Sequence, residues 1–243
     1  MIHQTKAIVL KHTKYGDSSL IVQLFTETLG LISIIAKGAR NSKKNKTGNL
    51  YQIGNLLEIV LFYHPNKNFQ IVNEVKIAYM YQELNESMVH NCIMQFAIEN
   101  VQQMVERDTP LEELFYILYD FLVRLDKVHQ SLLAHVPLYF LLALIRYNGY
   151  SIVGAYSTTT PIFDLYQGKF VASIAEQTIY IDGEYAQSLS VLNEIKQFED
   201  ILLLNILKAH RQYLIDVLIK YMQIHIPNYK PLKSLGILNT ILN

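Results

Sequence analysis

The first 80 residues consist of short segments in which apolar and polar residues alternate, with no stretch of helical periodicity between them. Alternation with a period of two, in segments rich in β-branched and aromatic types, is typical of strands that bury one face. Glycine, proline, asparagine and aspartate between the segments supply turns. The sequence therefore predicts five strands, at residues 6–10, 19–25, 31–36, 56–63 and 69–77.

Five short strands without an intervening long helix suit a small antiparallel barrel, and the five-stranded barrel that binds oligonucleotides is the OB-fold. From about Leu84 the period becomes helical, except at residues 151–183, which contain three short extended segments. We therefore predict an α+β chain with an OB-fold β-barrel at residues 1–80. A mainly α-helical domain would follow at 81–243, with a small β-hairpin-like insertion at about 151–183.

Capping signals place some of the helix ends. Thr109, Pro110 and Glu112 match the N-cap, the first turn and the capping-box position of a helix start. A further helix from about residue 132 to 147 would stop at Asn148-Gly149. The last long helix is expected from about residue 198 to 224, ended by Pro227.

A net charge of zero conceals an uneven distribution. Residues 1–80 carry ten lysines and arginines against four acids, whereas the remaining residues carry eleven bases and seventeen acids. The first part of the chain is thus expected to meet a polyanion, and the acidic remainder to meet something else.

The remaining composition argues against several classes of protein. One cysteine, Cys92, allows no internal disulfide and no cysteine-rich zinc site, which fits a reducing, cytoplasmic compartment. The N-terminus lacks the pattern of a signal peptide, and the longest apolar runs are shorter than a membrane span, so we expect no membrane association.

Enzyme motifs are weak. No phosphate-binding loop or His-Glu-x-x-His motif occurs, and the histidines are scattered, so no cofactor, small-molecule substrate, catalytic residue or metal ligand is assigned. Residues 16–18 and 126–129 are similar to two sequence blocks of one esterase family. That family requires a strand-helix-strand sandwich and a histidine near the C-terminus, which this sequence does not supply. We therefore predict that the chain is not an enzyme.

The segment from residue 37 to 46 is the most informative candidate site, because it holds five cations and no acid between two strands. Its cations are Lys37, Arg40, Lys43, Lys44 and Lys46. If all five paired with phosphates of a single strand, the logarithm of the affinity would fall with the logarithm of salt with a slope of about −3.5. The competing interpretation, which the composition supports about equally, is a solvated charged loop.

Aromatic residues are interleaved with these cations, and base stacking on such rings contributes roughly 1 to 3 kcal/mol per base. For most of them, interior packing in a small barrel is the better interpretation. The residues concerned are Tyr15, Phe25, Tyr51, Phe62, Tyr63 and Phe69. In the helical part, an apolar stretch around residues 139–147 could form a groove for a partner's tail, although ordinary core packing is favoured.

An ordered set of short motifs resembles the opening of the bacterial RecO family. It comprises residues 7–10, Tyr15-Gly16-Asp17-Ser18-Ser19, Phe25-Thr26-Glu27 with Gly30, and Lys37-Gly38-Ala39-Arg40. Gly149-Tyr150 after a long apolar helix and Pro231-Leu232-Lys233-Ser234-Leu235 resemble the family's middle and closing segments. The resemblance thus spans nearly the whole chain.

The resemblance implies a mediator of DNA repair and homologous recombination in a RecF/RecR-type pathway, acting at the bacterial nucleoid. Such a protein binds single- and double-stranded DNA, anneals complementary strands and helps load RecA onto strands covered by single-stranded DNA-binding protein. Its partners would be RecR and the C-terminal tail of the single-stranded DNA-binding protein. The five cations of residues 37–46 would then be DNA-contacting residues.

One departure from the family is evident. Many RecO-like proteins carry a four-cysteine zinc element where residues 151–183 lie, and none of those ligands occurs here. We expect a metal-free hairpin held by Phe163, Phe170 and Tyr180. The alternative function is a non-catalytic interaction adaptor that uses a helical docking surface and does not bind DNA.

Overall fold

The computed structural model describes the chain except for residues 1, 41–46 and 243. It divides into two compact units, Met1–Lys127 and Val128–Asn243, and we consider each by itself. The change from strands to helices near residue 80 lies inside the first unit. As a domain boundary, the division between residues 80 and 81 remains a prediction.

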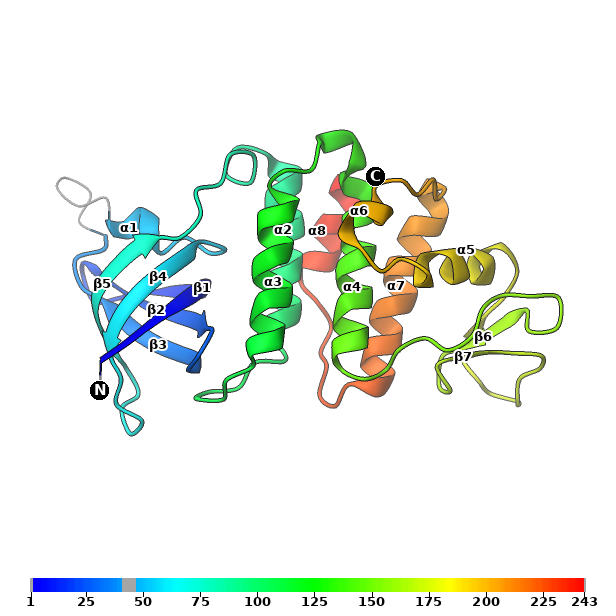
Figure 1. The fold of residues 1–243 in the computed structure, drawn as a ribbon, viewed down its shortest axis with the longest axis horizontal. Coiled ribbons are helices and arrows are strands. Elements are labelled where there is room, and N and C mark those ends of the chain that lie inside the picture. Colours follow the sequence, from blue (N-terminus) through cyan, green and yellow to red (C-terminus); the bar gives the residue numbers. More distant parts are fainter. Residues whose placement is uncertain (1, 41–46, 243) are drawn as a thin grey trace. The chain divides into compact units, whose positions relative to one another are not determined.

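The N-terminal strands form one antiparallel sheet in the order β3-β2-β1-β4-β5 (Figure 1). The strands are β1 (Ile2–Tyr15), β2 (Ser19–Thr26), β3 (Gly30–Ala36), β4 (Leu56–Phe62) and β5 (Ile71–Ile77). A short helix, α1 (Thr47–Leu50), precedes β4. The five predicted strands are therefore confirmed, with β1 longer at both ends than the alternation indicated.

The two edge strands of this sheet approach each other, as closure into a barrel requires. Gln70, just before β5, forms a parallel bridge with Ile34 of β3, and its N–H donates to the Ser33 carbonyl at 2.8 Å. This bridged contact between the two edge strands is short, so the barrel is partly open along the rest of β5. This is the OB-like architecture that the strand pattern predicted.

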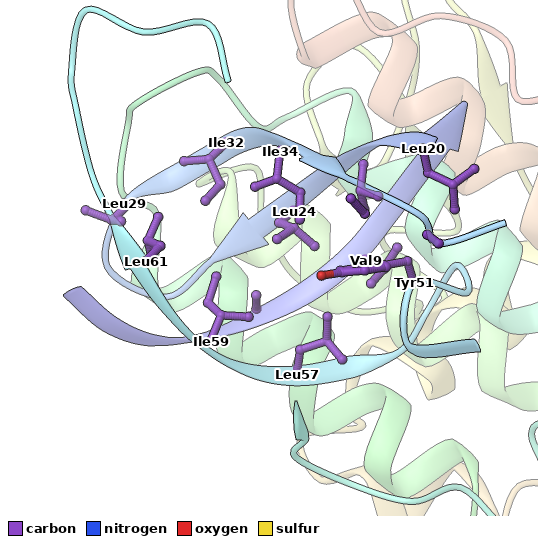
Figure 2. Close-up of a cluster of buried hydrophobic side chains, with 14 residues drawn as sticks. Val9, Leu20, Leu24, Leu29, Ile32, Ile34, Tyr51, Leu57, Ile59 and Leu61 are labelled. Carbon is purple, nitrogen blue, oxygen red and sulfur yellow. The ribbon is translucent and has the colours of Figure 1, made fainter. Parts of the chain in front are cut away.

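The barrel interior is filled by alternate residues of each strand (Figure 2). Val9, Leu24, Ile34 and Leu57 are each at most 1% exposed, and the Tyr51 ring points from the chain before β4 into this cluster. Burial raises the pKa of the Tyr51 phenol. A dry, close-packed interior of this kind leaves ligands the rims and outer faces of the barrel.

One outer face of the barrel is covered by the helices α2 (Met88–Gln102) and α3 (Glu112–Leu125). Ile8 pairs with Phe25 across β1 and β2, and both side chains are fully buried although neither belongs to the interior cluster. The Phe25 ring meets Phe115 of α3 edge-on at 5.5 Å. The uninterrupted apolar run of residues 7–10 is explained by this double burial.

A buried carboxylate fixes the connection between the barrel and these helices. Asp126, 3% exposed at the end of α3, accepts N–H bonds from Gln82, Glu83 and Leu84 at 2.9–3.1 Å, and a bond from the Tyr79 hydroxyl. Asp126 belongs to one of the esterase-like blocks. In this structure, however, its role is to hold the segment that follows β5.

The second unit is built around two apolar helices, α4 (Val136–Tyr147) and α7 (Lys208–His225), which pack together (Figure 1). The 3₁₀ helix η1 (Gln130–His135) leads into α4, and α5 (Gly183–Asn193), α6 (Phe198–Ile201) and α8 (Ser234–Ile241) complete the unit. Residues 130–147 are the one stretch, among the described residues, long and apolar enough to cross a membrane. Phe140, Leu141 and Leu144 within it are fully buried, as in the core helix of a globular unit.

The interruption at residues 151–183 forms the predicted small sheet, with the strand order β7-β6-β8. Its strands are β6 (Ile162–Asp164), β7 (Lys169–Val171) and β8 (Tyr180–Ile181). Phe163 and Phe170 are buried with ring centroids 5.2 Å apart. The expectation for Tyr180 was wrong: it is 43% exposed, and Ile181 and Tyr221 of α7 are buried instead.

Two predicted helix boundaries were also wrong. Thr109 does not cap α3, because its hydroxyl donates to the Arg107 carbonyl, and the helix begins at Glu112 after Leu111. The last long helix is divided into α6 and α7 by residues 202–207. Apart from Asn205 that segment is apolar, and it lacks the apolar stripe flanked by polar residues that marks a single buried helix face. The break buries Ile206 and leaves Leu203 exposed.

Candidate nucleic-acid interface

Two of the five predicted DNA-contacting cations can be placed. Lys37 and Arg40 lie in the turn that follows β3, and both side chains are exposed. Lys43, Lys44 and Lys46 lie outside the described residues. The described part of this segment therefore presents its cations at one end of the barrel.

Arg40 holds its own turn against the β1–β2 hairpin. Its backbone N–H donates to the Ser18 carbonyl at 2.9 Å, and its guanidinium Nη1 donates to the Gly16 carbonyl at 3.1 Å. Gly16 and Gly38 both have positive φ, at 56° and 68°, so each turn uses the conformation that glycine adopts without strain. A guanidinium has five N–H donors, so Arg40 retains several for an anion.

Lys14, which was not among the predicted DNA-contacting residues, lies beside Arg40. Both residues line a hollow of about 620 Å³ at the end of β1, together with His12, Leu20 and Ala39. The His12 ring is fixed by a hydrogen bond between Nδ1 and the Tyr51 carbonyl at 2.8 Å. The signal that could have identified Lys14 is its position immediately before the Tyr15-Gly16-Asp17 turn, next to the basic segment across the hairpin.

A second hollow lies along the open seam between β3 and β5. It has a volume of about 590 Å³ and is lined on one side by residues 34–37, which end in Lys37. The other side comprises Lys67, Phe69 and residues of β5, and Tyr51 also lines the hollow. Lys67 belongs to the β4–β5 loop and was not among the predicted DNA-contacting residues either. We call this hollow the seam groove.

Five exposed cations of the barrel, four of which line these hollows, form no ion pair with an acidic residue in the described part of the chain. Within the described part of the chain, Lys11, Lys14, Lys37, Arg40 and Lys67 have no carboxylate at ion-pair distance. Lys76 differs, since it pairs with Glu58 at 2.7 Å, and the hydrogen bond with this carboxylate raises the pKa of the lysine. An exposed cation without a protein counter-ion can exchange its solvent counter-ions for phosphate.

The interleaved aromatic residues divide into two groups. Phe25 and Tyr51 are buried, as interior packing predicted, whereas Tyr15 is 49% exposed and Phe62 and Phe69 are each 39% exposed. Of these three exposed rings, only Phe69 lines a described hollow that also contains cations. Tyr63 is partly buried and donates to Asp108.

The apolar stretch of the helical unit does not open into a groove at the residues the sequence indicated. Phe140, Leu141 and Leu142 are buried, and Tyr139 packs edge-on against Phe198 with ring centroids 5.2 Å apart. Among the residues with described positions, no group of three or more His, Cys, Asp or Glu side chains could hold a metal ion.

Comparison with known proteins connects this architecture to a family. The family model described as "Recombination protein O N terminal" matches residues 1–81, which comprise the barrel strands. The protein named "DNA repair protein RecO" from Christiangramia forsetii is 28% identical over 99% of both chains. The protein of the same name from Porphyromonas gingivalis is 27% identical over the full length of both.

A shorter stretch of the chain is matched at higher identity. A "DNA repair protein RecO" from Chlorobium phaeobacteroides is 43% identical over 77 residues, which are 32% of this chain and 29% of the relative. The N-terminal sheet has the expected strand order. The full-length matches extend the similarity through the helical part. The chain is thus similar over nearly its whole length to DNA repair proteins named RecO, and its first 81 residues match the N-terminal model of that family.

Proposed function

We propose that this protein binds single- and double-stranded DNA through the end of its barrel, anneals complementary strands and helps load RecA onto strands covered by single-stranded DNA-binding protein. In keeping with the family, it acts as a recombination mediator without covalent chemistry. Its site of action would be the bacterial cytoplasm, at the nucleoid.

The observation that carries the proposal is a set of exposed barrel cations: Lys14, Lys37 and Arg40 at the end where β1 and β3 finish, and Lys67 in the β4–β5 loop. Lys14 and Arg40 share one hollow, Lys37 and Lys67 share the seam groove, and in the described residues none of the four has a carboxylate partner. OB-folds bind oligonucleotides through the loops after their first and fourth strands. Here Arg40 is bonded to the first of these loops, and Lys67 belongs to the second.

The same arrangement accounts for annealing without a nucleophile. Two complementary strands repel each other through their phosphates, and cations that neutralise both reduce that repulsion. Lys43, Lys44 and Lys46 continue the basic segment in sequence, and we propose that they contact DNA together with Lys37 and Arg40.

Replacing Lys43, Lys44 and Lys46 together by Glu tests the DNA-binding proposal. We expect binding to a labelled single strand to be lost while the circular dichroism spectrum and the thermal midpoint stay the same, because charged loop residues contribute little to folding. Unchanged affinity at low salt would reject the proposal and favour the interaction adaptor.

The partner proposal is tested separately. We propose that RecR and the acidic, apolar C-terminal tail of single-stranded DNA-binding protein bind this protein, as the family resemblance implies. An annealing assay on strands coated with intact single-stranded DNA-binding protein, compared with a variant that lacks the tail, should show faster annealing only with the tail present. Equal rates would contradict the tail interaction.

A further inference from the structure

We propose that the seam groove selects unpaired DNA by stacking one nucleobase on Phe69, with the adjoining phosphates at Lys37 and Lys67. This inference rests on the proposed function and assigns to one ring the preference for single strands. The charged end of the barrel would attract any DNA, whereas the groove would distinguish unpaired from paired bases.

The composition of the groove supports a nucleotide as its occupant. It combines an exposed aromatic ring, apolar strand residues and two cations from opposite sides. Its volume of about 590 Å³ falls within the roughly 300–1,000 Å³ typical of small-ligand sites. A nucleotide combines a base with an apolar face and an anionic backbone. A groove that contains both an aromatic ring and cations therefore matches the chemistry of a nucleotide.

The loop that carries Phe69 is held in place from inside. The Gln70 side chain, 4% exposed, accepts from the His64 N–H at 2.8 Å and donates to the His64 and Lys67 carbonyls at 3.0 and 3.1 Å. Because three hydrogen bonds from one buried amide close the loop, Lys67 and Phe69 do not need to be ordered when a ligand arrives.

The loop is also held from outside. The Arg107 guanidinium donates to the Asn68 carbonyl at 2.9 Å, to the Asn68 side-chain oxygen at 3.0 Å and to the Lys67 carbonyl at 3.3 Å. Arg107 itself forms a bridge with Leu31 at the start of β3. The segment before α3 therefore fixes the loop relative to the opposite side of the groove.

Duplex DNA cannot use this ring in the same way. A paired base is covered on both faces by its neighbours, and exposing one requires unpairing and unstacking. The phosphates of a duplex can still reach Lys37 and Lys67. Loss of the Phe69 ring should consequently affect single strands and leave duplex binding almost unchanged.

The test is Phe69→Ala in the full chain, with Phe62→Ala as a matched control. Phe62 is equally exposed at 39% and lies on the neighbouring strand β4, but it does not line the groove. By the usual contribution of one stacked base, Phe69→Ala should weaken binding to a labelled thymidine oligomer about tenfold, whereas Phe62→Ala and Phe69→Tyr should bind as the unchanged protein does.

A second probe identifies the base as the contact. An oligomer of equal length in which abasic sites replace the bases retains the phosphates, so Phe69→Ala and the unchanged protein should bind it equally. Equal affinity of the Phe69→Ala and Phe62→Ala variants for the thymidine oligomer would overturn the inference, as would an equal loss on duplex DNA.

These outcomes are distinguishable from failure of the proposed function. If the unchanged protein binds DNA and loses affinity when loop lysines are replaced, the proposed function stands whatever the Phe69 variant does. If the unchanged protein binds no DNA at low salt, both the proposed function and the groove assignment are rejected.

Discussion

Two arginines of the helical unit and three lysines of the barrel differ in what their charged groups contact. In the helical unit, Arg146 donates to the Asn193 carbonyl at 3.0 Å and Arg211 to the Ile206 carbonyl at 2.7 Å, so each guanidinium joins segments of the same unit. In the barrel, Lys11, Lys14 and Lys37 are exposed and, among the described residues, have no ion-pair partner. One set stabilises a fold, and the other is available to a ligand.

This difference shows why a count of charges is an incomplete guide to binding. A guanidinium whose donors are already directed at backbone carbonyls would have to break those bonds to bind phosphate. An exposed ammonium releases only solvent ions when it does so. Because exposed lysines occur in both units, the barrel is favoured as the proposed DNA-binding surface by the gathering of Lys14, Lys37, Arg40 and Lys67 around two of its hollows.

The largest effect should follow from neutralising the exposed cations of the barrel. We expect the combined change of Lys11, Lys14 and Lys37 to Gln to weaken single-strand binding about a hundredfold at 0.1 M salt, because each lost phosphate contact removes roughly 0.7 from the salt slope. Fluorescence anisotropy with a labelled oligomer measures the loss.

The matched control changes Lys169, Lys196 and Lys220 of the helical unit to Gln. These lysines are also exposed, and the control alters the net charge by the same amount. It should bind within about twofold of the unchanged protein. An equal loss in both triple variants would mean that total charge, not the barrel surface, determines the affinity.

A smaller effect, on stability and not on DNA affinity, is expected from Arg146→Met. This change keeps the apolar stem but removes the donor to Asn193, so the free energy of unfolding should fall by about 1 to 2 kcal/mol while DNA affinity stays the same. Lys220→Met, on the exposed side of α7, should cost no more than about 0.5 kcal/mol. Urea denaturation measures both, and a loss of DNA affinity in Arg146→Met would break the contrast between the units.

A pH effect is expected from the helical unit. Burial, and then the positive charge of Arg211, lower the pKa of His135 below 6.5. The fold thus favours the neutral ring, so its contribution to stability is present above pH 6.5 and is lost as the pH falls through the lowered pKa. In a proton NMR titration, the His135 ring signals should shift with a midpoint below pH 6.5, and a midpoint at or above 6.5 would be inconsistent with this environment.

The smallest expected effect lies in the barrel unit at high pH. The hydrogen bond from Tyr116 to Glu27 raises the pKa of the phenol to about 12. The stability from this bond is present below pH 10 and is lost as the pH rises through about 12. Tyr116→Phe should cost about 1 kcal/mol at pH 7 and remove one late-titrating phenol from the ultraviolet absorbance titration. A phenol signal that disappears near pH 10 would contradict the assignment.

The elements of the barrel were predictable because each strand buries one face against a shared interior. Residues 19–25 and 31–36 alternate in sequence, and Val22, Leu24, Ile32 and Ile34 all enter that interior. The break between α6 and α7 was not predictable, since residues 202–207 are apolar apart from Asn205, and only tertiary contacts select Ile206 for burial. The exposure of Tyr180 likewise depends on how α7 packs against the small sheet.

The candidate site was predictable only in part. A dense basic segment indicated Lys37 and Arg40, but Lys14 and Lys67 are separated from it in sequence and adjoin the same hollows only through strand pairing. Phe62 and Phe69 are indistinguishable by sequence pattern, and only the loop closed by Gln70 directs one of them to the seam groove.

The salt dependence of single-strand binding by the unchanged protein tests the central claim most directly. If exposed barrel cations supply the affinity, a plot of log affinity against log salt from 50 to 400 mM should be linear, with a slope of about −3.5 for the five cations of residues 37–46 and steeper by roughly 0.7 for each further contact at Lys11, Lys14 or Lys67. A slope near zero, with measurable binding throughout, would contradict the account.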